Sequence, residues 1–178
     1  YESALHRFEG EAVVESLEDP AIGDVSALAL HGDQLWSVSF WRGSRAVRYG
    51  LSPLRIEASR SLGGAHYDVE VDTARDRLWA SAYMGSRVRV LRATDLGDVG
   101  TIRTGLGTRA LALDAERGIL LASSVYDGVI TAADASTGRV RGRLRVGGHV
   151  KDIAIDPAGE AWFASRCGVF RLDLSAWP

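Results

Sequence analysis

One short segment of the chain places three side chains with acid–base or metal-binding chemistry at alternating positions. The segment reads HYDVEV over residues 66–71. Alternate side chains of an extended strand share one side and lie about 7 Å apart, so His66, Asp68 and Glu70 are expected to face the same way. A histidine and two carboxylates suit a hard divalent cation, or an acid–base pair in which the pKa of Glu70 is raised. The alternative is a solvated wall in which Glu70 pairs with an arginine such as Arg109.

A second group of candidates consists of aromatic and basic residues at strand starts and in segments that connect predicted strands. Aromatic rings there can stack on a planar or sugar ligand, and the basic side chains can bind its polar groups. The expected ligand-binding residues are His66, Tyr67, Arg109, His149, Lys151, Trp41, Tyr83 and Tyr126.

The elements that carry these residues repeat along the chain. An apolar residue followed by aspartate recurs every 42 residues, and so do a serine after alanine and a glycine. The repeated positions are Asp72, Asp114 and Asp156; Ser81, Ser123 and Ser165; and Gly63, Gly105 and Gly147. The last copy reads Trp-Phe-Ala-Ser over residues 162–165, where the second reads Leu-Trp-Ala-Ser. A further copy lies upstream at residues 28–37, displaced by one residue because its turn is shorter.

Within each copy the apolar residues alternate with a period of two, which indicates strands rather than helices. Turns that begin with aspartate and end with glycine separate the alternating segments. The third copy therefore predicts four strands, at residues 109–114, 119–124, 128–133 and 139–146. We refer to the four strands of a copy as A to D. Asp152 repeats the position of Asp68 in the last copy and is a further candidate for the carboxylate cluster.

Four antiparallel strands in about 40–45 residues are typical of one blade of a β-propeller. The third copy resembles the YVTN-type propeller repeat and its NHL-type relatives. The resemblance lies in its apolar-Asp pair, its Leu-Leu-Ala-Ser-Ser and Val-Ile-Thr-Ala-Ala-Asp strands, and its Ser-Thr-Gly and Val-Gly-Gly turns. It covers about residues 23–174 and implies the fold. The asparagine-rich turns usual in that family are absent, since the chain contains no asparagine.

The strand count predicts an all-β single domain over residues 1–178, with two alternatives for the ring. Blades are expected at residues 26–62, 67–104, 109–146 and 151–174, the last with strands A to C only. Residues 11–17 would supply its missing strand and close a four-bladed propeller, because an open ring leaves unpaired edges. In the other alternative the chain is part of a larger ring, cut at its ends or completed by a second copy.

Composition excludes several classes of protein. The net charge of −2 argues against a nucleic-acid partner. No apolar run reaches the length of about 18 residues that a membrane span needs. One cysteine excludes an internal disulfide and leaves the compartment open, with secretion or the periplasm as candidates. The first residue is tyrosine, and no signal peptide follows, so we expect a processed or truncated chain.

Three functions are compatible with this pattern. The first is a ligand- or protein-binding propeller module that uses the loops at the mouth of the channel. The second is a metal-assisted lyase or hydrolase, similar to gluconolactonases or streptogramin lyases, with a divalent cation at His66, Asp68 and Glu70. The third is a structural partial propeller that assembles with a second copy or another chain. The sequence leaves open whether the protein is an enzyme.

Overall fold

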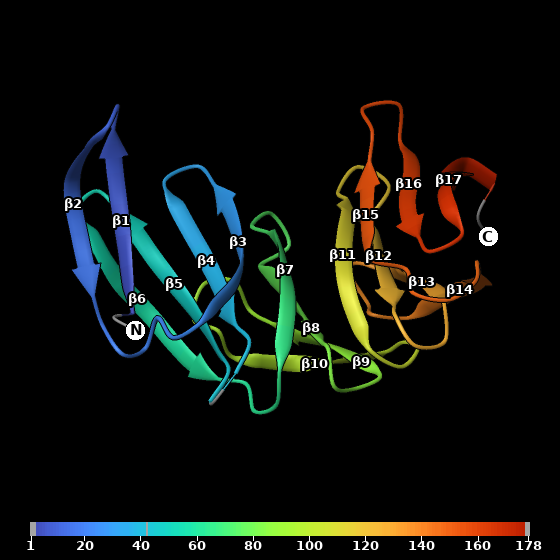
Figure 1. Cartoon of the computed structure of the whole chain (residues 1–178), viewed down its shortest axis with the longest axis horizontal. Coiled ribbons are helices and arrows are strands. Elements are labelled where there is room, and N and C mark those ends of the chain that lie inside the picture. The colour runs from blue at the N-terminus through green and yellow to red at the C-terminus, as the bar shows by residue number, and fades with distance from the viewer. Residues whose placement is uncertain (1–2, 42, 177–178) are drawn as a thin grey trace.

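The computed structural model describes residues 3–41 and 43–176, and it is built from antiparallel strands (Figure 1). An N-terminal hairpin comprises β1 (Ala4–Glu9) and β2 (Ala12–Glu18). The first sheet comprises β3 (Val25–His31), β4 (Gln34–Ser39), β5 (Arg45–Leu51) and β6 (Leu54–Ser61). The second comprises β7 (His66–Asp72), β8 (Arg77–Ala82), β9 (Arg87–Leu91) and β10 (Asp98–Arg103). The third comprises β11 (Thr108–Asp114), β12 (Ile119–Ser124), β13 (Val129–Asp134) and β14 (Val140–Arg145).

The last sheet has three strands, β15 (Asp152–Ile155), β16 (Glu160–Ser165) and β17 (Gly168–Asp173), and is followed by the 3-10 turn η1 (Leu174–Ala176). Sequential strands are neighbours in every sheet. The prediction of repeated four-stranded antiparallel sheets is confirmed, and the strands of the third repeat lie within one residue of their predicted bounds.

The sheets follow one another along an arc (Figure 1). Strand A of each sheet contacts strand A of the next: β3 contacts β7, β7 contacts β11, and β11 contacts β15. Apolar clusters fill the spaces between successive sheets. Trp36 lies between the first and second sheets, and Trp79 lies between the second and third, both almost completely buried. These two tryptophans, which occupy the same position in strand B of their repeats, therefore form core between sheets.

The repeated serine of strand B compensates for an irregularity in strand A. The register of β7 shifts between His66 and Val69, and that of β11 shifts between Thr108 and Leu111. Such a bulge leaves a backbone N–H group without its ladder partner. In β7 the N–H group of Asp68 donates to Ser81 Oγ at 2.9 Å. The equivalent bond in β11 joins Ala110 N to Ser123 Oγ, also at 2.9 Å. The serine thus satisfies the donor that each bulge frees.

The last repeat is displaced by one residue from its expected alignment. Glu70 is paired with Trp79 across strands A and B, and Ala154 is paired with Trp162. Trp162 is therefore the structural equivalent of Trp79, whereas the sequence motif aligned it with Leu78. The shift arises because pairing follows the apolar faces of the strands, and the shorter turn before β16 moves these faces by one residue.

The strand that was predicted to complete the last sheet lies elsewhere in this structure. Residues 12–18 form β2, which pairs with β1, and Leu5 and Leu17 of this hairpin pack against an apolar cluster of β4 and β5 in the first sheet. In the described part of the chain β17 has one strand neighbour, β16. The two ends of the arc lie on opposite sides of the molecule (Figure 1). Closure through residues 11–17 is not realised here, and the number of blades in a complete ring stays a prediction.

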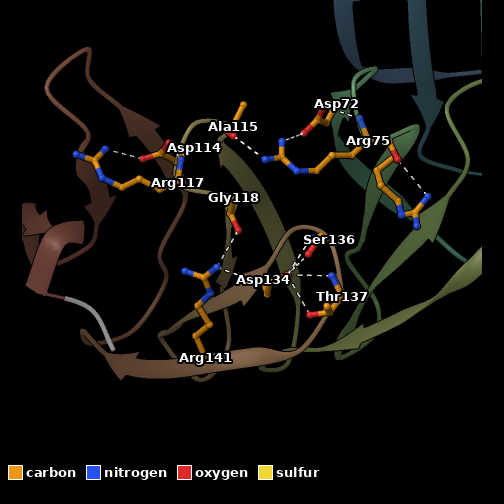
Figure 2. Close-up of polar contacts among 11 residues, drawn as sticks. Asp72, Arg75, Asp114, Ala115, Arg117, Gly118, Asp134, Ser136, Thr137 and Arg141 are labelled. Atoms are coloured by element: carbon orange, nitrogen blue, oxygen red, sulfur yellow. Dashed lines mark hydrogen bonds and ion pairs between the residues drawn. The ribbon is translucent and has the colours of Figure 1, made fainter.

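The turns between strands A and B carry a repeated Asp-Arg pair (Figure 2). The carboxylate of Asp72 accepts from the backbone and guanidinium of Arg75, and Asp114 does the same for Arg117. Arg75 also donates to Ala115 O in the next sheet at 3.0 Å. The turn-forming aspartates of the repeat thus position arginines, one of which links adjacent sheets.

Candidate functional site

Five aromatic side chains from three successive sheets meet at one edge of those sheets. They are Phe40, Trp41, Tyr67, Tyr83 and Tyr126, which we call the aromatic cluster. The ring centroids of Phe40 lie 4.6 Å from Trp41, 5.8 Å from Tyr67 and 5.5 Å from Tyr83. Tyr83 lies 5.6 Å from Tyr67 and 6.2 Å from Tyr126. These separations are within the range of favourable aromatic pairs.

The elements that bring these rings together are the loops between strands B and C and the starts of strand A. Phe40 and Trp41 follow β4, Tyr83 follows β8, and Tyr126 follows β12. Tyr67 is the second residue of β7. These positions all lie at the same edge because strands A and B are antiparallel, so the end of one adjoins the start of the other. The cluster therefore spans the first, second and third sheets.

Arg109, at the second position of β11, adds a positive charge to the cluster. Its guanidinium carbon lies 4.3 Å from the centroid of the Tyr67 ring, and Nη2 donates to the Tyr67 hydroxyl at 2.8 Å. A cation over an aromatic face is attracted to it electrostatically. Hydrogen bonding to Tyr126 raises the pKa of the neighbouring Tyr83 hydroxyl, so that group is neutral at physiological pH.

Part of the cluster is open to solvent. Trp41 is 57% exposed and Tyr126 is 52% exposed, whereas Phe40, Tyr67 and Tyr83 are half-buried. The half-buried rings hold the arrangement in place, and the two exposed rings offer apolar faces at its rim. An arrangement of this kind can stack on the face of a ligand ring while phenol and guanidinium groups bind its polar substituents.

The structure unites five of the predicted ligand-binding residues and separates the other three. Trp41, Tyr67, Tyr83, Tyr126 and Arg109 lie together. Sequence reasoning missed Phe40, although its position beside Trp41 in a predicted loop was a usable signal. The backbone N–H group of His149 donates to Val125 O at 2.9 Å, which places His149 on the same edge but outside the cluster. Lys151 is exposed just before the first strand of the last sheet.

His66 is buried beneath this edge rather than presented on it. Ser44 Oγ donates to Ser39 O at 2.5 Å and lies 3.0 Å from His66 Nδ1. The single hydroxyl proton of Ser44 forms the hydrogen bond to Ser39 O, so Ser44 can only accept from His66. The ring proton of His66 is therefore on Nδ1, which donates to Ser44 Oγ. Burial, followed by the charges of Arg89 and Arg87, lowers the pKa of His66 to about 4. His66 is therefore a neutral residue of the core between the first two sheets.

Asp68 and Glu70 are close to each other but have different surroundings. Asp68 accepts from the backbone of Val69 and, across to the third sheet, from Leu111 N, both at 2.8 Å. Burial raises the pKa of Asp68, and these hydrogen bonds oppose the rise. Burial and the nearby Asp68 raise the pKa of Glu70 to about 7. Within residues 3–41 and 43–176, no arginine or lysine forms an ion pair with Glu70, and the suggested partner Arg109 bonds to Tyr67 instead.

The structure does not bring His66, Asp68 and Glu70 together as a metal site. In the described residues there is no group of three or more His, Cys, Asp or Glu side chains arranged to hold a metal ion. The physical reason is the bulge between His66 and Val69, which breaks the strict alternation on which the prediction relied. Asp152 affects the pKa of Asp68, but its own Oδ1 accepts from Ile153 N at 3.0 Å.

Replacing Asp68 with alanine is expected to lower the free energy of unfolding by about 1–3 kcal/mol, because the buried Leu111 N–H group loses its acceptor. The measurement is urea unfolding at pH 7. Asp152→Ala is the matched control, since Asp152 has the same repeat position but is exposed, and its loss is expected to stay within about 0.5 kcal/mol. Equal losses in the two variants would contradict a stabilising bond between the second and third sheets.

Comparisons with known proteins agree on the fold and give no family. No family model and no curated protein matches the chain. It is similar to the computationally designed Ika4 protein, with a TM-score of 0.71 and 14% identity, covering 83% of this chain and 89% of that chain. It is also similar to the computationally designed Ika8 protein, with a TM-score of 0.66 and 15% identity, covering 83% of this chain but only 46% of that chain.

At these identities the likeness concerns the fold alone. Together with the observed topology, it defines the class of this protein: an all-β repeat protein with a propeller-like succession of antiparallel four-stranded sheets. In the described part of the chain, no helix is long and apolar enough to cross a membrane.

Proposed function

We propose that the chain is a ligand-binding module of a YVTN- or NHL-like propeller, and that the aromatic cluster binds a sugar or another ligand with a flat ring face. The observation that carries the proposal is the convergence of five aromatic side chains from three sheets on one edge, with Trp41 and Tyr126 about half-exposed. Exposed aromatic side chains that are held by a rigid base suit ring stacking.

Arg109 favours a ligand that also carries hydrogen-bond acceptors. Its charge lies over Tyr67, so the guanidinium group is fixed within the cluster rather than free in solvent. A sugar or a planar acid has both a ring face and acceptor oxygens, and both chemistries would then be met at one site. A metal-assisted reaction has no comparable support, since in the described residues His66, Asp68 and Glu70 do not form a group arranged to hold a metal ion.

Binding is tested by titrating mono- and disaccharides and planar aromatic acids while saturation-transfer NMR and tryptophan fluorescence are recorded. Trp41→Ala and Tyr126→Ala are each expected to weaken binding by roughly 5- to 30-fold, because each removes an apolar ring of the size that dominates binding energy. Phe8→Ala is the control, since Phe8 is an exposed aromatic residue on the N-terminal hairpin.

Equal weakening by Phe8→Ala would place the binding surface elsewhere. The same conclusion would follow if every ligand that binds did so with unchanged affinity to Trp41→Ala and Tyr126→Ala.

A further inference from the structure

Successive sheets of the arc pack against each other through the same kind of apolar interface. At each end of the arc, one side of this interface is exposed because it has no neighbouring sheet in the described part of the chain. We call Leu28 and Leu30 of β3 the leading face, and Trp162 of β16 with Val169 of β17 the trailing face. Each apolar side chain has structural equivalents in the other sheets, which the cross-strand pairing identifies. Those equivalents show what normally covers each face.

The leading face is exposed where its equivalents are covered. Leu28 is 53% exposed, and Leu30 is 65% exposed. The residues equivalent to Leu28 are Val69, Leu111 and Ile153, and all three are buried against the preceding sheet. The N-terminal hairpin packs against an apolar cluster of β4 and β5. Among the described residues, strand β3 lacks a preceding first strand, whereas β7 contacts β3, β11 contacts β7 and β15 contacts β11.

The trailing face is exposed for the complementary reason. Trp162 is 40% exposed, and Val169 is 71% exposed. The equivalents of Trp162 are Trp36, Trp79 and Leu121, and those of Val169 are Ala46, Val88 and Ile130. All six are almost completely buried against the following sheet. In the described residues no sheet follows β15–β17, so its two apolar side chains remain open to solvent.

The internal interfaces pair the two kinds of face directly. Trp36 and Val69 belong to one apolar cluster, as do Trp79 and Leu111 in the next and Leu121 and Ile153 in the third. Trp162 and Leu28 are the equivalents of these paired residues at the two ends of the arc, and both are exposed. The occupant that fits the leading face is therefore the trailing face of a sheet of this same sequence.

Strand β1 resembles β17 and lies where β17 would have to dock. β1 reads ALHRFE and β17 reads GVFRLD, so small, aliphatic, ring-bearing, arginine, apolar and acidic residues follow in the same order. Leu5 of β1 shares an apolar cluster with Leu35 of β4, and Val88, the equivalent of Val169, shares one with Leu120, the equivalent of Leu35. Strand β1 thus resembles strand C of a preceding sheet, and β2, which pairs with β1, corresponds to strand D of that sheet. If β17 docked in the place of β1, it would pair with β2.

We propose that a second copy of this chain docks its trailing face on the leading face, with β17 of one copy replacing β1 as the partner of β2 in the other. A second copy is favoured over the chain's own last sheet because the two ends of a single arc lie on opposite sides of the molecule (Figure 1). Two copies that contact each other at both ends form a closed ring, since each offers one face of each kind.

The size of a related structure fits this arrangement. The arc matches 46% of the Ika8 chain, so two such arcs span a fold of about that length. Burial of four partly exposed apolar side chains at each junction supplies the driving force, at roughly 25 cal/mol per Å² of apolar surface removed from water.

The first test is the mass of the chain in solution, measured by sedimentation and by light scattering over a range of concentrations. The expected result is a species of twice 19.2 kDa whose population increases with concentration. Leu28→Arg and Val169→Arg should each raise its dissociation constant by at least about tenfold, because each places a charge in both junctions of the ring. Val99→Arg, at an exposed apolar residue of β10 outside both faces, should leave it unchanged.

Mixing the two variants tests the head-to-tail geometry. Leu28→Arg keeps an intact trailing face, and Val169→Arg keeps an intact leading face, so an equimolar mixture can form one undamaged junction. The mixture is expected to contain more of the two-copy species than either variant alone at the same total concentration. A parent chain that stays monomeric at every concentration overturns the proposal, and so does a mixture that associates no better than the separate variants.

Discussion

Trp79→Ala is expected to lower the free energy of unfolding by about 3–5 kcal/mol, the range for removal of a buried tryptophan. Trp79 is fully buried and fills the space between the second and third sheets, where its cluster includes Leu111 and Val88. Interiors of this density relax only partly around a cavity, so the lost contacts are not regained. For a domain of this length the melting temperature should fall by roughly 6–20 °C, as measured by circular dichroism.

Two further variants show whether the loss of stability in Trp79→Ala comes from buried packing or from the removal of any tryptophan. Trp41→Ala should change the free energy of unfolding by no more than about 0.5 kcal/mol, because Trp41 is largely exposed. Trp79→Phe should cost less than Trp79→Ala, about 1–2 kcal/mol, since it keeps a ring and removes an indole N–H group that has no partner in the described residues. If Trp79→Ala cost no more than Trp41→Ala, the cluster between these sheets would not stabilise the arc.

Glu70→Ala is expected to stabilise the protein at pH 8 and to change its stability little at pH 5. The pKa of Glu70 rises from 4.5 to about 7 on folding, mainly through burial. Between these two values the folded state binds a proton that the unfolded state has lost, so the stability of the parent decreases as pH rises through this window. The shift corresponds to at most about 3 kcal/mol. Alanine stands at the equivalent positions 29, 112 and 154, so the backbone accepts it.

The measurement is urea unfolding of parent and variant at intervals from pH 4.5 to pH 8. His66 acts in the opposite direction, because its pKa falls to about 4 on folding and the parent therefore loses stability as pH decreases. The difference between parent and variant cancels this contribution and isolates Glu70. Glu70→Gln should give the same pH dependence as Glu70→Ala, since it also removes the titrating group. A difference that does not vary with pH would contradict a raised pKa at Glu70.

Local patterns in the sequence were sufficient to predict the strands and their grouping. Alternation of apolar residues and turns that start with aspartate depend on neighbours a few residues away, so they specify strands without knowledge of the rest of the chain. The strand pattern also predicted that Trp41, Tyr83 and Tyr126 lie in loops between strands B and C. In the structure these three residues follow β4, β8 and β12, and their rings belong to one cluster. In the described residues His66, Asp68 and Glu70 are not grouped as the metal hypothesis expected, because that hypothesis assumed regular alternation through His66 and a bulge interrupts the strand there.

The sequence by itself determined an all-β repeat of four-stranded units, because strand periodicity and turn chemistry are short-range properties. Only the tertiary structure decided which residues are equivalent in the last repeat, where Trp162 rather than Phe163 takes the place of Trp79. It also decided that β2 pairs with β1 and that the arc ends in two exposed apolar faces. These features depend on contacts between segments far apart in the chain, and several registers and partners satisfy the same alternating pattern until the sheets pack against one another.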